Sequence, residues 1–401
     1  MGNCNDSSNL LEFRRTALTK KPAYKVYVGS LDRVVKAIEE SIETHSKNTY
    51  GCKENKPFIT LISPPRHGKS LTLDTLFTDS KFSNFLVISI TYNHITNISA
   101  SELTTWEMAV DYFWLRAFKS LTRSDETLER LYNMYNYKPW SLSRVISKVR
   151  KRMVNPFEDD VGNKRNIIIC VDEFSLLTDM AKETWTSQEC QSFIGRIRDT
   201  IRNANPIVQF VFTGFHSTMT DMMLSSSANE HHVLEQCSFS LSKPLLEIIR
   251  GVYVQNNVQF PMLLFESVKS TPGLVGLWAE RACDGNLDSQ LSTFQQQTAW
   301  LIQITNNDCY KDNYNAVVSF MRILERTLEA GGRDVSADID AAGAPLVEKQ
   351  IGVGGCKGRF PEIIPLCFVL IIKTMFNRSG SNPLLESLNS ALKYCEMVDD
   401  K

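Results

Sequence analysis

Residues 58–73 read FITLISPPRHGKSLTL, and this stretch decides how the first half of the chain folds. The run FITLIS is short, apolar and β-branched, which predicts a buried strand that ends at the two prolines. Leu71, Leu73 and Leu76 follow helical spacing and predict a helix after the lysine. The expected local order is therefore strand, tight loop and helix.

Three residues of this loop have the chemistry of a phosphate-binding loop. Gly68 lets the backbone approach an anion, Lys69 would reach the β and γ oxygens of a nucleotide, and Ser70 would ligate magnesium. Arg66 and His67 have two equal readings, contact with phosphate or exposure to solvent. The residues that we expect to bind ATP here are Pro65, Arg66, His67, Gly68, Lys69, Ser70 and Leu71.

The first half of the loop departs from the common pattern G-x-x-x-x-G-K-[ST]. Ser63 stands where the pattern has its first glycine, and Pro64 and Pro65 remove two backbone donors. We still expect nucleotide to bind, because the donors nearest the β-phosphate come from His67 through Ser70.

A second stretch, IIICVDEF at residues 167–174, ends an apolar run with two adjacent acids. Acids at the end of a buried strand are costly unless something uses them. In nucleotide hydrolysis one carboxylate positions magnesium and the next orients and deprotonates the attacking water. Asp172 suits the metal role, with Ser70, and Glu173 the catalytic role, with Lys69. The alternative is a strand end that opens into a solvated turn.

The run VFTGF at residues 211–215 contributes a third element. Thr213 ends an apolar strand at the position from which a hydroxyl could sense the γ-phosphate. Threonine is also common in strands for packing reasons, so both readings stay open.

Apolar runs separated by helical patterns predict an α/β domain with a mostly parallel sheet covered on both faces. The strands are expected at residues 58–63, 84–90, 166–174 and 206–215, and helical patterns at 34–42, 101–121, 140–153 and 187–203. Helical patterns dominate beyond residue 242. We expect a flexible connection at residues 331–345, then a short hairpin and a buried helix near residues 363–372. His231 and His232 are assigned to a surface loop.

These patterns divide the chain into four segments. They are an N-terminal helical lead-in at 1–55, an NTPase core at 56–242, a helical lid-like region at 243–330 and a C-terminal module at 331–401.

The composition is ordinary for a globular protein, with 43% hydrophobic and 22% charged residues in 401. The formal net charge of -1 supplies no global field toward nucleic acid or anionic membranes. The basic cluster KVRKR at residues 148–152 could be a nucleic-acid patch, but apolar spacing through it favours the solvated face of an amphipathic helix. The 10 cysteines show no metal-ligand spacing. An intracellular chain, cytoplasmic or nuclear, without a membrane span is expected, and acylation of Gly2 or Cys4 is left open.

The segments PPRHGKS, IIICVDE and VFTG, in this order, resemble the Walker A, Walker B and sensor-1 elements of P-loop ATPases of the AAA+/STAND kind. The Pro-Arg-x-Gly-Lys-Ser form more narrowly resembles predicted AAA-type ATPases, including Crinkler-like and transposon-associated NTPases. The resemblance implies a three-layer P-loop NTPase fold, followed by a mainly helical and winged-helix-like C-terminal region. TPGLVGLWAERA, from Thr271, is similar to the helical entry after the ATPase core of STAND proteins.

The resemblance implies Mg-dependent ATP binding and hydrolysis that drives a conformational switch or motor. The alternatives are a non-hydrolysing nucleotide-binding interaction module and, less favoured, a small-molecule P-loop kinase. A protein partner or self-association is expected, and nucleic acid stays open as a partner. Some proteins of this kind carry a trans-acting arginine before the sensor strand, where this chain has Arg196, Arg198 and Arg202. A solvated helix face is the more ordinary reading of these three arginines.

Overall fold

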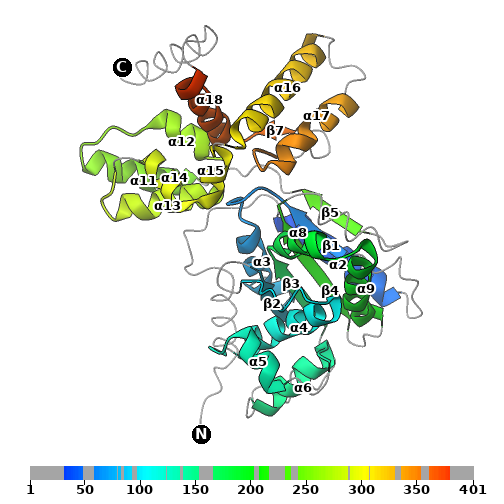
Figure 1. The fold of residues 1–401 in the computed structure, drawn as a ribbon. Helices are drawn as coiled ribbons and strands as arrows, with labels where there is room; N and C mark the ends of the chain where they lie inside the picture. The colour runs from blue at the N-terminus through cyan, green and yellow to red at the C-terminus, as the bar shows by residue number, and fades with distance from the viewer. Residues whose placement is uncertain are drawn as a thin grey trace. The chain divides into compact units, whose positions relative to one another are not determined.

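The structure of the protein is a computed structural model (Figure 1). It describes residues 31–47, 58–78, 80–82, 85–92, 97–122, 124–135, 139–152, 166–202, 207–215, 231–235, 243–287, 290–306, 308–329, 336–353 and 361–379. Contacts divide these residues into two compact units. The first comprises Leu31–Ile62 and Lys69–Leu234, and the second comprises Ser63–Gly68 and the chain from Glu235 onward.

A five-stranded sheet in the order β2-β3-β4-β1-β5 forms the centre of the first unit (Figure 1). The pairs β1–β4, β3–β4 and β2–β3 are parallel. The strands are β1 (Phe58–Ile62), β2 (Leu86–Thr91), β3 (Ile167–Asp172), β4 (Val208–Gly214) and β5 (His231–Glu235). Strand β4 lies between β1 and β3, so that Leu61 pairs with Thr213 and Val171 pairs with Phe212. The end of β4 therefore lies between the ends of the two strands expected to carry the site.

Helices cover both faces of this sheet, which confirms the three-layer α/β prediction. Successive side chains of a strand point to opposite faces. In β3, Ile168 and Cys170 join the core cluster with α2 and α3, whereas Ile167 and Ile169 join the cluster of the other face. The helices of the first unit are α2 (Leu31–Lys47), α3 (Lys69–Thr78), η2 (Ser80–Phe82), α4 (Trp106–Thr122), α5 (Leu128–Tyr135), α6 (Leu142–Arg152), α8 (Phe174–Thr184) and α9 (Ser187–Arg202).

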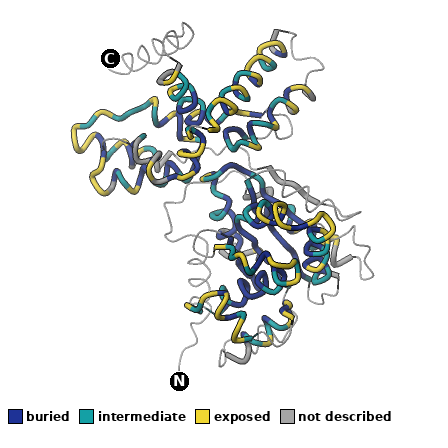
Figure 2. Tube along the Cα trace, viewed as in Figure 1, coloured by how far each residue is buried: buried dark blue, intermediate teal, exposed yellow. Residues whose placement is uncertain are grey.

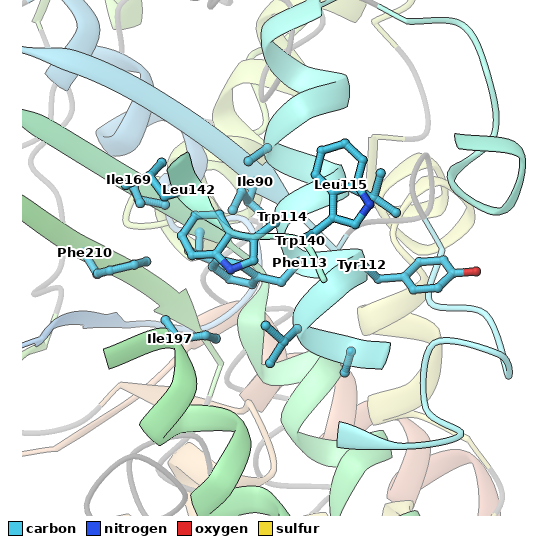
Figure 3. Packing of buried hydrophobic residues seen from close by; sticks show 14 of the residues in the cluster. Ile90, Tyr112, Phe113, Trp114, Leu115, Trp140, Leu142, Ile169, Ile197 and Phe210 are labelled. Carbon is cyan, nitrogen blue, oxygen red and sulfur yellow. The ribbon is translucent and has the colours of Figure 1, made fainter. Parts of the chain in front are cut away.

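The larger core cluster is rich in aromatic side chains (Figure 3). Phe113 and Trp114 of α4 are buried beside Phe210 of β4, and the Phe113 and Phe210 ring centroids are 6.4 Å apart. Trp140 packs against Phe118 with centroids 5.4 Å apart. Figure 2 shows strands β1 to β4 buried along nearly all of their length and the helices exposed on their outer faces. Apolar packing thus holds the helices against both faces of the sheet.

The second unit is mainly helical, as expected for the C-terminal region. Its elements are α11 (Lys243–Gln255), α12 (Met262–Val268), α13 (Pro272–Cys283), α14 (Gln290–Gln297), α15 (Ala299–Ile304), α16 (Tyr310–Glu329), α17 (Ser336–Glu348), β6 (Gly352–Val353), β7 (Glu362–Ile363) and α18 (Pro365–Ser379). Strands β6 and β7 form an antiparallel pair, so the predicted hairpin followed by a buried helix is confirmed. The winged-helix-like character and the four segment boundaries stay predictions.

Two expectations from the sequence are wrong, one in each unit. Residues 336–345 lie in α17 and not in a flexible connection, because the alanine-rich segment forms helix and buries Ile339 and Leu346. His231 and His232 begin strand β5 and do not lie in a loop. The sequence patterns also missed α5 and α8 in the first unit. Residues 2 and 4, where acylation was left open, fall outside the described residues.

Candidate functional site

The site is built at the carboxyl ends of β3 and β4 and at the start of α3. Asp172 is the last residue of β3, Thr213 is the second-last of β4, and Lys69 and Ser70 begin α3. Parallel strands bring their carboxyl ends to one edge of a sheet, which is where open α/β sheets bind ligands. Topology therefore brings together four predicted residues that are far apart in the sequence.

Asp172 is the centre of a hydrogen-bond network. It is buried, with 1% of its surface exposed. The Ser70 hydroxyl donates to Asp172 Oδ2 at 2.7 Å, and the Thr213 hydroxyl donates to Asp172 Oδ1 at 2.7 Å. Both carboxylate oxygens thus accept a hydrogen bond from a predicted site residue, which offsets the cost of burying the charge.

Thr213 also fixes the neighbouring acid. Its hydroxyl accepts a hydrogen bond from the Glu173 backbone N–H at 3.0 Å. Glu173 lies between β3 and α8 with φ 55° and ψ 36°, in the left-handed region, and its side chain makes no helix-capping hydrogen bond. A non-glycine residue in this conformation costs about 1–3 kcal/mol and is concentrated at functional sites. The turn therefore holds Glu173 where ordinary local preferences would not place it.

Lys69 is buried, with 5% of its surface exposed, and its Nζ lies 4.5 Å from the centroid of the Phe215 ring. Burial lowers the pKa of Lys69 from its ordinary value of 10.5 to about 8, and the charges of Asp172 and Glu173 partly oppose this change. The ammonium group is thus poorly solvated and lies near two acids. Such a cation would be stabilised by additional anionic oxygen.

The loop before α3 has two residues in the left-handed region, Arg66 with φ 65° and Gly68 with φ 79°. His67 is buried, and its Nδ1 lies 3.0 Å from the Pro65 carbonyl oxygen. Exposure to solvent, one of the two readings of His67, is therefore wrong, whereas Arg66 is exposed. Leu71 is half-buried on the first turn of α3.

The oxygen groups Ser70 Oγ and Asp172 Oδ2 fit a magnesium ion, which prefers a few oxygen ligands together with water and substrate phosphates. The Ser70 hydroxyl can donate its proton to Asp172 while its oxygen lone pairs stay available to a metal. Among the described residues, no group of three or more His, Cys, Asp and Glu side chains forms a protein-only metal cage.

The three arginines of α9 lie in different environments. Arg196 is exposed, whereas Arg198 is 4% exposed and lies over the Phe58 ring at 4.2 Å. A trans-acting arginine needs to reach a neighbouring molecule, so the burial of Arg198 does not favour that role. The solvated-face reading is also wrong for Arg198. The Arg202 side chain lies outside the described residues.

Two further features bear on the sequence predictions. The basic cluster lies on α6, whose Leu142, Val145 and Val149 are buried, as an amphipathic helix requires. No helix in the described part of the chain is both long enough and apolar enough to cross a membrane. The sequence reasoning missed Phe215, whose aromatic ring directly follows the β4 residues that it did single out.

Comparison with known proteins finds similar solved structures. No family model matches the chain, and no curated protein matches it. A Walker-type ATPase of Pyrococcus abyssi matches with a TM-score of 0.45 and 15% identity, over 85% of this chain and 95% of that one. Cdc6p from Pyrobaculum aerophilum matches with a TM-score of 0.35 and 10% identity, over 90% and 97%. The ORC2 protein of Aeropyrum pernix matches with a TM-score of 0.38 and 9% identity, over 94% and 98%.

Proposed function

We propose that the protein is a magnesium-dependent ATPase whose nucleotide state drives a conformational switch or motor. The observation that carries this proposal is the pair of hydrogen bonds that join Ser70 and Thr213 to the two oxygens of Asp172. Three separate chain segments converge on one buried carboxylate. Together with the buried Lys69, they form a site with the cation and the oxygens that a metal-bound triphosphate requires.

Each residue has a distinct role in this proposal. Lys69 holds the β and γ oxygens, and the loop amides from His67 through Ser70 hold the phosphates. Ser70 and, through water, Asp172 would hold magnesium, which would supply positive charge against the phosphates. Glu173 orients and deprotonates the attacking water.

Thr213 is proposed as the sensor of the γ-phosphate. Its hydroxyl is hydrogen-bonded to both the Asp172 carboxylate and the Glu173 backbone N–H. Movement of either acid would therefore displace Thr213 at the end of β4. The hydroxyl also helps to hold Glu173 in its left-handed conformation. A change in the γ-phosphate would thereby reach the backbone of the sheet.

The rival function is a nucleotide-binding module without hydrolysis. The prolines at 64 and 65 favour it, because they remove two amide donors from the loop. The serine at 63 also favours it, because the common pattern has a glycine at this tight turn. In that protein ATP and ADP would bind, but no phosphate would be released. A small-molecule kinase would instead leave a phosphorylated acceptor.

The test compares wild-type protein with Glu173→Gln. We expect the variant to bind ATP with wild-type affinity in calorimetry and to lose about 10²- to 10⁴-fold in phosphate release, the usual contribution of a general base. Glu183 is an exposed acid on α8, the helix that Glu173 precedes, so Glu183→Gln is the matched control and should release phosphate at the wild-type rate. Undiminished turnover in Glu173→Gln would remove Glu173 from its role. Tight binding without turnover in the wild type would support the rival.

The narrower identity and partners of this ATPase are also proposals. A protein partner or self-association is the expected target of the switch, and nucleic acid stays open. The resemblance to Crinkler-like or transposon-associated NTPases stays a prediction from the loop sequence, and so does the intracellular location.

A further inference from the structure

The backbone of the phosphate loop contacts a helix that begins about two hundred residues later in the chain. The Gly273 backbone N–H donates to the Arg66 carbonyl oxygen at 2.8 Å. Gly273 is the second residue of α13, and both it and the loop belong to the second compact unit. The loop residues therefore have a partner outside the β1 and α3 elements that they connect.

This contact satisfies a backbone donor at the start of α13. The first N–H groups of a helix have no acceptor within the helix, and a capping side chain usually supplies one. Thr271 stands at the N-cap but makes no side-chain capping hydrogen bond, and its buried hydroxyl has no partner among the described residues. Pro272 has no N–H. The Arg66 carbonyl therefore takes the capping role for the Gly273 amide.

The contact also requires glycine at this place. A Cβ on residue 273 would lie 2.9 Å from the Arg66 carbonyl oxygen, 3.0 Å from Arg66 Cβ and 3.1 Å from Arg66 Cα. Two of these three atoms belong to the backbone, so the neighbour could not rotate away as the end of a flexible side chain would. Gly276, one turn further along α13, has open space at the corresponding position.

Two features of the loop make its backbone conformation unfavourable without outside contacts. It lacks the first glycine of the common pattern, and Arg66 is held in the left-handed region that costs a non-glycine residue about 1–2 kcal/mol. A strained backbone persists when its surroundings determine it. The hydrogen bond from Gly273 acts on the carbonyl of this strained residue, two positions before Gly68.

We infer that Gly273 is a positioning residue for the phosphate loop, which holds Arg66 in its left-handed conformation through the start of α13. The inference deepens the proposed function and rests on it for the claim that the loop binds ATP. Its structural part, that Gly273 sets the conformation of the loop, can be tested without nucleotide. In consequence, a shift of α13 and a change in the loop are coupled events.

The experiment compares wild-type protein, Gly273→Ala and the matched control Gly276→Ala. Without nucleotide, hydrogen exchange of the segment 63–71 should be faster in Gly273→Ala and unchanged in Gly276→Ala. With ATP, Gly273→Ala should bind about tenfold more weakly, because a misplacement of about 1 Å costs up to 10²-fold and the shift needed here is smaller. Once ATP is bound at saturating concentration, turnover should stay near wild type, so that KM rises more than kcat falls.

A second substitution tests whether Arg66 is the point of action. Arg66→Gly removes the Arg66 Cβ, one of the three atoms that the added methyl group meets, and takes the left-handed conformation at no cost. Added to Gly273→Ala, it should restore part of the lost loop protection and ATP affinity. A general loss of helix packing would not be rescued in this way.

The outcomes separate the two proposals. Loop exchange in Gly273→Ala equal to wild type overturns the inference whether or not ATP binds. If the loop exchanges faster in Gly273→Ala but the wild-type protein binds no ATP, the positioning role of Gly273 is supported and the proposed function is refuted. If Gly273→Ala does not fold, exchange of the Gly273 amide in the wild type decides. A slow amide at this helix position supports the bond to Arg66, and a fast one overturns it.

Discussion

Buried cations at the two edges of the central sheet differ in their partners: those at the carboxyl edge lie near acids, and in the described part of the chain the one at the amino edge does not. At the carboxyl edge, Arg116 donates to Glu102 Oε2 at 2.6 Å, and Lys69 lies near the acids Asp172 and Glu173. At the amino edge, Arg198 lies over Phe58, the first residue of β1, and its three guanidinium nitrogens have no hydrogen-bond partner among the described residues. All three cations lie over an aromatic ring. The acids around them are what differ.

This difference indicates what each cation is for. Arg116 is fully paired, because it also donates to the carbonyl oxygens of Thr91 and Asn97. Lys69 has acids near it and a lowered pKa, which suits a residue that gains further anionic partners on binding. Arg198 is held by packing alone, and burial lowers its pKa to about 10. Substituting each by methionine separates structural, ligand-binding and packing roles.

The largest effect is expected for Arg116→Met. It leaves the Glu102 carboxyl buried without its cation, and burial already raises the pKa of Glu102. Breaking a buried pair from one side costs about 3–5 kcal/mol. We expect the free energy of unfolding to fall by this amount in urea titration. The double variant Arg116→Met with Glu102→Leu should recover part of the loss, and an equal loss in both would contradict the pairing.

Lys69→Met should have the second-largest effect, a loss of ATP binding. Losing a buried, charge-paired contact costs about 2–5 kcal/mol of binding free energy, which calorimetry with Mg-ATP measures. The folded protein should become more stable, because a poorly solvated ammonium is replaced by an apolar chain. Arg198→Met is the control, with wild-type ATP affinity. Unchanged binding in Lys69→Met would place the nucleotide elsewhere.

Much of the carboxyl edge could be predicted from the sequence. Strand ends marked by Asp172 and Thr213 and the Gly-Lys-Ser start of a helix are local patterns, and a parallel sheet brings them together. The pair of Arg116 and Glu102 has no such pattern. Arg198 does lie at helical spacing from the buried Ile194 and Ile201, so its burial could have been foreseen. The bond from Gly273 to Arg66 depends on tertiary packing and leaves no trace in either segment.

Thr213→Val tests the network around Asp172. It leaves Asp172 Oδ1 and the Glu173 N–H without the Thr213 hydroxyl, and an unsatisfied buried group costs about 1–3 kcal/mol. We expect about 2 kcal/mol lower stability together with slower phosphate release, because Glu173 loses its restraint. Thr213→Ser keeps the hydroxyl and should retain both. Wild-type turnover in Thr213→Val would show that the bond does not position Glu173.

The lowered pKa of Lys69 predicts a pH dependence. Below pH 8 both the folded and the unfolded chain carry charged Lys69, so the full cost of burying the charge lowers the stability of the folded protein. Between pH 8 and 10.5 only the unfolded chain keeps this proton. The cost therefore disappears, and the stability rises, as the pH increases toward 10.5. ATP should therefore bind with uptake of close to one proton at pH 9 and little at pH 7. Calorimetry in two buffers of different ionisation enthalpy measures this uptake, which Lys69→Met should abolish.

The smallest effect is expected for Arg198→Met at the amino edge. Removing a buried guanidinium without partners relieves an unsatisfied group, which costs about 1–3 kcal/mol, but it also loses the contact with the Phe58 ring, worth about 0.5–2 kcal/mol. The net gain in unfolding free energy should be about 1 kcal/mol, opposite in sign to the change in Arg116→Met. Arg198→Lys, which keeps a cation there, should gain nothing. A loss of stability in Arg198→Met would mean that the ring contact outweighs the missing hydrogen bonds. The buried arginines of both edges would then stabilise the fold, although of the two only Arg116 has an acid as its partner among the residues that the structure describes.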